Sequence, residues 1–316
     1  MCPAPPPITL PVGPKTGMAR QFRQRLNQKG IVVMPGAFNA LSARLIEQAG
    51  FEAVYITGAG LINGLTGYPD IGLLGVQEVA DLAGHIANAV GVPCICDADT
   101  GFGETFNVMR TVQLFEQRGL AGLHIEDQVA PKRCGHLDGK QIISIAAMQQ
   151  KVAAACSART NPDFVVIARV DAAAVEGFDA AVTRAKAYVA AGADAIFIEA
   201  LTQREEFARF AEQLHDVPLL ANMTEFGKTP MLSAAEFEAM GYKMVIFPMS
   251  CFRVMAGALA EFLGDLKATG SQANWLERMQ TRQSLYELLA YSAYNDQDKA
   301  LSELIKECVD GSHQGV

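Results

Sequence analysis

The feature that most constrains this chain is a set of eight short apolar runs, rich in Val and Ile, that recur along most of its length. They span residues 31–34, 53–57, 92–97, 121–126, 164–169, 194–199, 217–221 and 243–247. Each run is almost continuously apolar and does not alternate with polar residues. This pattern is typical of strands buried on both faces, as in a parallel sheet.

Amphipathic, Ala-rich segments separate these runs. Their apolar residues recur every three or four positions, as in Val182, Ala185 and Val189, which predicts helices. The helices are expected at about 39–49, 76–90, 107–118, 146–158, 175–191, 203–214 and 233–239. Eight strands alternating with helices predict an α/β protein with a (β/α)8 TIM barrel fold. A doubly wound sheet usually has five or six strands, and the first strand-to-helix turn lacks G-x-G-x-x-G, so the barrel is favoured.

The two ends of the chain differ from this pattern. Residues 1–17 are rich in proline and are expected to form a flexible arm, whereas residues 293–316 are expected to be a tail. The barrel domain is placed at 18–292. Its last part contains two further predicted helices, at 251–268 and 273–290. One completes the barrel, and the other needs a surface for its apolar side chains, for which a neighbouring subunit is a candidate.

Composition narrows the class of protein. Of 316 residues, half are hydrophobic and 19% are charged, so the chain can bury a sizeable core. A net charge of −8 argues against a nucleic-acid-binding protein but not against a small anionic substrate. The seven cysteines form no C-x-x-C pair and indicate a reducing, cytoplasmic compartment. We expect neither a secretory signal nor a membrane span, because residues 1–17 show no basic region followed by an apolar stretch and no apolar run reaches roughly 18 residues.

Carboxylates gather where the predicted strands end, which in a barrel is the catalytic face. Asp97 and Asp99 follow the third strand, Glu126 ends the fourth, and Asp70 lies in the long loop after the second. Several carboxylates without clustered His or Cys predict a site for Mg2+ or Mn2+, held partly through water. The alternative is that these carboxylates cap helices or pair with Arg169 and Arg110.

A second candidate lies in the long loop after the fourth strand, in the sequence Lys132-Arg133-Cys134-Gly135-His136, followed by Lys140. Three cationic or potentially cationic side chains surround one cysteine. Their field would favour the thiolate and attract a polycarboxylate. A loop of this length can close over a site. The alternative is a solvated basic loop with an inert cysteine.

With these motifs in place, the chain resembles the isocitrate lyase/phosphoenolpyruvate mutase superfamily over about residues 18–292. The Lys-Arg-Cys-Gly-His loop is specific to the lyases, and the C-terminal stretch resembles the 2-methylisocitrate lyases most. The matching stretches are Tyr55 to Gly60, Asp97-Ala-Asp99-x-Gly-Phe-Gly, His124-Ile-Glu126-Asp127-Gln128, Lys132 to His136, Asn161-Pro-Asp-Phe, Ala168-Arg169-x-Asp171-Ala, Asn222-x-Thr224-Glu225-Phe-Gly and Met279-Gln-Thr-Arg282-x-x-Leu-Tyr-Glu287.

The resemblance implies Mg2+-dependent cleavage of 2-methylisocitrate, a small 2-hydroxy tricarboxylate of propionate catabolism, to pyruvate and succinate. It implies that Asp99 binds the metal while Asp70, Asp97 and Glu126 hold its waters. Tyr55 or a neighbouring group would accept the hydroxyl proton, and Cys134 would protonate the carbanion. Lys132 and His136 complete the implied catalytic set. The implied substrate-binding residues are Thr57, Gly58, Arg133, Gly135, Arg169, Glu199, Asn222 and Thr224. The resemblance also implies a helix-swapped homotetramer, a dimer of dimers.

Three positions depart from the pattern of the 2-methylisocitrate lyases: Thr57 stands in place of Ser, Val170 in place of Thr and Ile198 in place of Pro. We expect these residues to lie in the pocket wall. The alternatives are therefore a lyase for a related 2-hydroxy diacid such as 2,3-dimethylmalate, or an oxaloacetate hydrolase or decarboxylase. A phosphonate-handling enzyme and a non-catalytic ligand-binding barrel are more distant alternatives.

Overall fold

The computed structural model describes residues 12–133 and 139–313 of the chain. Among them, the chain divides into two compact units. The first unit spans residues 14–258, and the second contains the described residues from 259 onwards. Each is described separately below.

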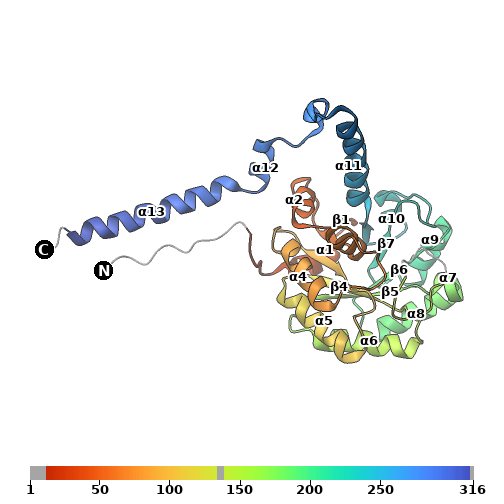
Figure 1. The fold of residues 1–316 in the computed structure, drawn as a ribbon. Helices are drawn as coiled ribbons and strands as arrows, with labels where there is room; N and C mark the ends of the chain where they lie inside the picture. Colours follow the sequence, from red (N-terminus) through yellow and green to blue (C-terminus); the bar gives the residue numbers. More distant parts are fainter. Residues whose placement is uncertain (1–11, 134–138, 314–316) are drawn as a thin grey trace. The chain divides into compact units, whose positions relative to one another are not determined.

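Eight parallel strands in the first unit form a closed barrel in sequence order, and helices surround it (Figure 1). The strands are β1 (Val32–Ala37), β2 (Val54–Ile56), β3 (Cys94–Asp97), β4 (Gly122–Glu126), β5 (Val165–Val170), β6 (Ala195–Ile198), β7 (Leu219–Asn222) and β8 (Met244–Phe247). The barrel closes where Val32 of β1 pairs with Met244 of β8. The predicted TIM barrel and its eight strands are confirmed.

The helices on the outside of the barrel agree with the predicted segments to within a few residues. They are α2 (Ala40–Gln48), α4 (Val76–Ala87), α5 (Thr105–Gln117), α6 (Ile145–Ala158), α8 (Phe178–Ala190), α9 (Arg204–Gln213) and α10 (Ala234–Ala239). Three short elements after strands were not predicted from the sequence: α3 (Gly58–Leu61), the π-helical turn Ile62–Thr66, and α7 (Ala173–Glu176). They are too short to show a helical period.

Side chains of the strands alternate between two apolar cores. Those that face outward, such as Ile56, Cys96 and Ile198, pack against the surrounding helices. Those that face the barrel axis, such as Ile95 and Ile167, pack together with side chains of α1 (Met18–Leu26). Helix α1 was also absent from the sequence analysis. It contributes to the interior core of the barrel, away from the polar ends of the strands.

Phe22 of α1 is fully buried in this interior core. Replacing it with alanine is expected to lower the free energy of unfolding by about 3–5 kcal/mol, because the cavity left inside a closed barrel collapses poorly. Chemical denaturation followed by circular dichroism measures this loss. The exposed Gln24 on the same helix is the matched control, and Gln24→Ala should leave the unfolding midpoint unchanged. Equal midpoints for Phe22→Ala and wild type would contradict the packing role of α1.

Helix α11 (Ser250–Thr269) confirms the helix predicted at 251–268. In the second unit, the prediction of one continuous helix over residues 273–290 is wrong in part. A 3-10 helix (Ala273–Arg278) and α12 (Arg282–Leu288) replace it, because Thr281 adopts an extended conformation and its side chain caps a new helix at the Ser284 N–H. Helix α13 (Tyr291–His313) covers most of the expected tail. None of the helices in the described ranges is long and apolar enough to cross a membrane.

Candidate active site

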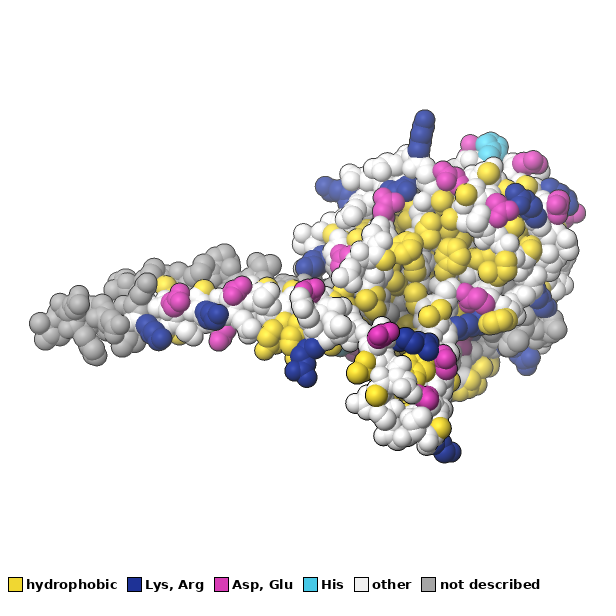
Figure 2. Space-filling view, turned by 90° about the horizontal axis from the view of Figure 1, so that it is seen from above, with side chains coloured by type: hydrophobic (Ala, Val, Ile, Leu, Met, Phe, Trp, Pro, Cys, Tyr) yellow, Lys and Arg dark blue, Asp and Glu magenta, His cyan; other side chains and the backbone are white. Residues whose placement is uncertain are grey.

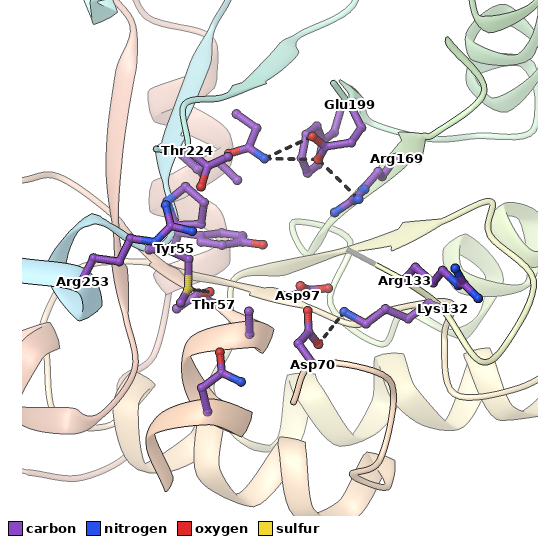
Figure 3. Close-up of a pocket in the computed structure, with 17 residues that line it drawn as sticks. Tyr55, Thr57, Asp70, Asp97, Lys132, Arg133, Arg169, Glu199, Thr224 and Arg253 are labelled. Atoms are coloured by element: carbon purple, nitrogen blue, oxygen red, sulfur yellow. Dashed lines mark hydrogen bonds and ion pairs between the residues drawn. The ribbon is translucent and has the colours of Figure 1, made fainter. Parts of the chain in front are cut away.

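A cavity of about 240 Å³ lies among the carboxyl ends of the barrel strands and the loops that follow them (Figure 3). Its walls come from most of the strands, so no single segment builds it. The predicted site residues that line it are Tyr55, Thr57, Asp70, Asp97, Lys132, Arg133, Arg169, Glu199, Asn222 and Thr224. Phe197, Ile246, Pro248 and Met249 add apolar surface. The cavity therefore has the mixture of ionic and apolar walls that a small organic acid requires.

Lys132 extends toward the carboxylate of Asp70 in the cavity (Figure 3). Its Nζ is 2.6 Å from Asp70 Oδ1 and 2.9 Å from Asp99 Oδ1, and only 6% of its side chain is exposed. Burial would lower the pKa of Lys132, but Asp99, Asp97, Glu126 and Asp70 outweigh burial and raise it well above its usual value. Lys132 is therefore a buried cation and not part of a solvated basic loop.

The turn after β3 places Asp97 and Asp99 through its own backbone. Asp97 Oδ1 accepts a hydrogen bond from the Asp99 N–H at 2.9 Å. Asp99 has a φ of 46°, a left-handed conformation that Asp and Asn adopt more easily than most residues. At the start of α3, a Cβ at Gly58 would lie 2.8 Å from Asp97 Oδ2, so a larger residue there would force this carboxylate to move. These contacts fix the direction of both carboxylates.

Burial and repulsion between the carboxylates change their acidity. Burial, together with the charges of Asp97 and Asp70, raises the pKa of Asp99 to about 6 despite Lys132. Burial likewise raises the pKa of Glu126 well above its usual value, and the charge of Asp171 adds to this effect. Asp97 differs from both, because His124, Lys132 and Arg169 outweigh burial and lower its pKa.

The fit of these residues to a divalent cation is mixed. Within the described ranges, no three His, Cys, Asp or Glu side chains form a ready-made coordination shell. Glu126 pairs with Arg169 at 3.3 Å, as the alternative interpretation expected, but its buried Oε1 has no hydrogen-bond partner in the part of the chain described. Such oxygen-only donors suit Mg2+, which keeps several waters and uses one or two carboxylates directly. The assignment of Asp99, Asp97, Asp70 and Glu126 to a metal site is therefore still a prediction.

Tyr55 and His124 form a buried pair inside the barrel. Tyr55 Oη lies 2.8 Å from His124 Nε2, and the same nitrogen is 3.6 Å from Asp97 Oδ1. Burial lowers the pKa of His124 to about 4, so the imidazole is neutral near pH 7. Burial and the charge of Asp97 raise the pKa of Tyr55 well above 10. Tyr55 is therefore a protonated phenol whose hydroxyl contacts a neutral imidazole nitrogen.

In another part of the cavity wall, Arg169 contacts three carboxylates. Its Nε lies 2.9 Å from Asp171 Oδ2, and its Nη2 lies 3.4 Å from Glu199 Oε2, in addition to the Glu126 contact. Asn222 donates to both oxygens of Glu199, at 3.2 and 3.3 Å. The Arg169 guanidinium also lies over the Phe197 ring, 5.1 Å from its centroid. These partners hold a cation in a defined orientation at the cavity wall.

Cys134, Gly135 and His136 lie outside the described residues. Arg133 before this segment and Lys140 after it both contact residues of the barrel. The Gln128 side-chain amide donates to the Arg133 carbonyl at 2.9 Å and accepts from the Arg133 N–H at 3.0 Å. Lys140 Nζ is 2.8 Å from Asp171 Oδ1, and its side chain is 1% exposed. The interpretation of a solvated basic loop is therefore wrong for Lys140 as well as for Lys132.

Some expectations about the pocket wall need correction. Thr57 lines the cavity, and its hydroxyl contacts Met249 Sδ at 3.5 Å. Val170 and Ile198, however, face the outer core between strands and helices. The alternation of a strand explains this, because their neighbours Arg169 and Glu199 face inward.

Sequence reasoning also missed Asn63, Met249 and Arg253, which line the cavity. The rule that polar groups follow strand ends could have found Arg253, because it comes six residues after the end of β8.

The family model described as phosphoenolpyruvate phosphomutase matches residues 22–267. The chain therefore belongs to the phosphoenolpyruvate mutase/isocitrate lyase superfamily, as its motifs predict. Among curated relatives, it is 51% identical to probable 2-methylisocitrate lyase 1 of Corynebacterium glutamicum, covering 90% of this chain and 93% of the relative. It is 44% identical to 2-methylisocitrate lyase of Bacillus subtilis, covering 91% and 94%.

Solved structures of related enzymes share the fold. The structure of 2,3-dimethylmalate lyase aligns with a TM-score of 0.85 at 37% identity and covers 90% of this chain and 96% of that one. A phosphonopyruvate hydrolase in complex with oxalate and Mg2+ aligns with a TM-score of 0.80 at 31% identity, covering 88% and 97%. The barrel fold is therefore shared with enzymes whose names refer to different small acids.

Proposed function

We propose that this protein is a carbon–carbon lyase that cleaves 2-methylisocitrate to pyruvate and succinate. The observation that carries the proposal is the cavity itself, in which a buried arginine, a buried phenol and a group of carboxylates converge at the strand ends. The 2-methylisocitrate lyases reported above cover nearly the whole chain, which supports this substrate over 2,3-dimethylmalate or oxaloacetate.

The reaction separates into a proton removal, a bond cleavage and a proton addition. Loss of the substrate hydroxyl proton lets the oxygen become the ketone of pyruvate while the bond between C2 and C3 breaks. The electron pair of that bond stays on C3 as an enediolate, and protonation of C3 gives succinate. Both proton transfers require positioned side chains.

We assign the first proton transfer to Tyr55. Its phenol is too weak an acid to exist as phenolate in this buried place, so it needs a partner that accepts its proton as it takes the substrate proton. We assign that role to His124 in the tautomer whose Nε2 carries no proton. Nε2 lies 2.8 Å from the hydroxyl and 3.6 Å from Asp97 Oδ1, whose charge would stabilise the imidazolium that forms. Cys134 is assigned the protonation of C3, and Lys132 and His136 the electrostatic support of that thiol.

The substrate carboxylates are assigned to the part of the cavity wall that contains Arg169. Arg169 supplies the positive charge, while Thr57, Asn222 and Thr224 supply hydrogen bonds. Gly58 is assigned a backbone contact, and Arg133 and Gly135 are assigned contacts from the loop. Glu199 orients Arg169 and Asn222, because it contacts both side chains.

Mg2+ is the proposed cofactor, with Mn2+ as a substitute. Asp99 would hold the ion directly, and Asp70, Asp97 and Glu126 would bind its water ligands. Bound Mg2+ would stabilise the negative charge that develops on the substrate oxygens. The phosphonopyruvate hydrolase structure with oxalate and Mg2+ supports this choice.

The apparent affinity for Mg2+ is expected to fall as the pH decreases below about 6, the pKa of Asp99 without metal. Protons compete with the cation for this carboxylate, so the affinity should be constant above pH 6 and fall by about tenfold per unit below it. Titration calorimetry with MgCl2 between pH 5 and 8 measures this, with circular dichroism as the control for folding. An affinity that is unchanged at pH 5 would contradict the role of Asp99.

Pyruvate release from a panel of acids tests the proposed function. The panel is 2-methylisocitrate, isocitrate, 2,3-dimethylmalate and oxaloacetate, each with and without Mg2+, with detection of glyoxylate and oxalate as well as pyruvate. We expect the highest kcat/KM with 2-methylisocitrate and dependence on the metal. Robust cleavage of only dimethylmalate or only oxaloacetate would overturn the substrate assignment but not the reaction site.

We also propose that the protein is a cytoplasmic homotetramer built from helix-swapped dimers. Helix α11 has no buried residue in the single chain, and Val254, Leu259 and Leu263 are exposed on it. An apolar groove of about 800 Å³ opens beside α2, and hydrophobic side chains gather on the face seen in Figure 2. Light scattering coupled to size exclusion tests this, and a monomer at micromolar concentration would contradict it.

A further inference from the structure

Arg169 is held at the cavity wall by three buried carboxylates. Glu126, Asp171 and Glu199 all lie within 3.4 Å of its guanidinium. Each of these carboxylates is at most 1% exposed, so water screens them poorly. A guanidinium surrounded in this way attracts a further anion weakly unless another cation offsets one of the carboxylates.

Lys140 provides that second cation. Its Nζ lies 2.8 Å from Asp171 Oδ1, and both side chains are almost completely buried. Asp171 Oδ1 also accepts from Arg169 Nη2 at 3.2 Å, while Asp171 Oδ2 accepts from Arg169 Nε at 2.9 Å. One carboxylate is therefore shared between the lysine and the arginine.

Other contacts fix Asp171 in this place. Its backbone N–H donates to Asp127 Oδ1 at 2.8 Å. Asp127 in turn accepts from the Tyr188 hydroxyl at 2.8 Å and lies 3.4 Å from Arg184. Because Asp127 fixes the Asp171 backbone, a change in the charge around the Asp171 side chain acts mainly on its two cationic partners, Lys140 and Arg169.

We propose that Lys140 is a positioning residue for substrate binding, which acts through Asp171 to leave the Arg169 guanidinium available to a carboxylate of the substrate. The inference rests on the proposed function in one respect, namely that Arg169 binds such a carboxylate. Lys140 belongs to the chain segment that follows the Lys132–His136 motif, so the same loop that carries this motif also sets the charge around Arg169.

Without Lys140, the negative charge of Asp171 acts on Arg169 alone, and one buried positive charge is lost beside the anion site. Lys140→Met keeps the length of the side chain and removes its charge. We expect it to raise the KM for 2-methylisocitrate by about 10–100-fold, the range for loss of a charged hydrogen-bonding partner, while kcat changes by less than about threefold. Lys140→Arg keeps the charge and should restore most of the affinity. Lys186→Met is the control, because Lys186 lies on the exposed face of α8 and contacts Gln213.

Two further measurements separate this inference from the proposed function. The first is calorimetric binding of succinate, whose affinity should fall in Lys140→Met in parallel with the rise in KM. If the wild type binds succinate but does not cleave 2-methylisocitrate, the proposed function fails and the succinate series still tests Lys140. The second is the crystal structure of Lys140→Met, in which Arg169 should lie closer to Asp171 and farther from Glu199.

Three results would overturn the inference. In the first, Lys140→Met unfolds at a lower temperature but keeps the wild-type KM and succinate affinity, as a purely structural residue would. In the second, Lys140→Arg binds no better than Lys140→Met although both are folded. In the third, Arg169 keeps its position in the crystal structure of Lys140→Met.

Discussion

Replacing Cys134 with alanine is expected to lower kcat for 2-methylisocitrate cleavage by about 10²–10⁴-fold, as the loss of a positioned general acid does. The carbanion formed on C3 needs a proton from the protein, and alanine has none to give. KM should change much less, because the thiol is assigned no role in binding the carboxylates. A coupled assay of pyruvate release measures both constants.

The matched control is Cys156→Ala. Cys156 lies on α6, where its thiol contacts the Gly192 carbonyl and burial raises its pKa, so it is poorly suited to donate or accept protons in catalysis. This variant should retain kcat within about twofold, and circular dichroism should show both variants folded. Turnover near the wild-type rate in Cys134→Ala would remove the cysteine from the mechanism.

The second large effect is expected for Asp99→Asn. The substitution removes one carboxylate charge from the proposed Mg2+ site, so the Mg2+ concentration needed for half-maximal activity should rise at least about tenfold. The rate at saturating Mg2+ should fall by about 10² or more, because the cation would lie less favourably for the charge that develops on the substrate. Kinetic titration with MgCl2 gives both numbers.

Asparagine is the informative substitution because of the backbone at this position. Asp99 has a φ of 46°, a conformation that Asn adopts more easily than Ala, so Asp99→Asn tests the charge with little added strain. The melting temperature should stay within about 3 °C of wild type. Asp163→Asn, which removes a carboxylate paired with the exposed Arg20, is the control for loss of charge alone. Wild-type dependence on Mg2+ in Asp99→Asn would contradict direct binding by this residue.

The barrel could be predicted from the sequence because its signal is periodic and local. Eight apolar runs at regular spacing leave few alternatives, and the position of each strand follows from the burial of both its faces. The segment 273–290 shows where this reasoning fails. Its apolar residues continue at helical spacing through Met279, but Thr281 caps a new helix, so periodicity alone misses the break.

The candidate site was predicted in part. Asp70, Asp97, Arg169, Glu199 and Asn222 line one cavity because strand ends in a barrel meet at one face.

The orientation of the Lys132 side chain could not be predicted from the sequence. The sequence left open whether Lys132 belongs to the site or to a solvated basic loop, and the structure buries it against Asp70 and Asp99, two carboxylates more than 30 residues away in sequence.

The sequence by itself determined the family, the barrel and the list of groups that could do chemistry, because apolar periodicity and strand-end motifs are properties of neighbouring residues. Only the tertiary structure decided which of these groups form ion pairs with one another and which of them reach the cavity. The pairing of Lys140 with Asp171, and the exclusion of Val170 and Ile198 from the cavity, depend on the closure of the barrel. Closure brings distant side chains into a space with little water, where a few ångströms decide whether a carboxylate is neutralised.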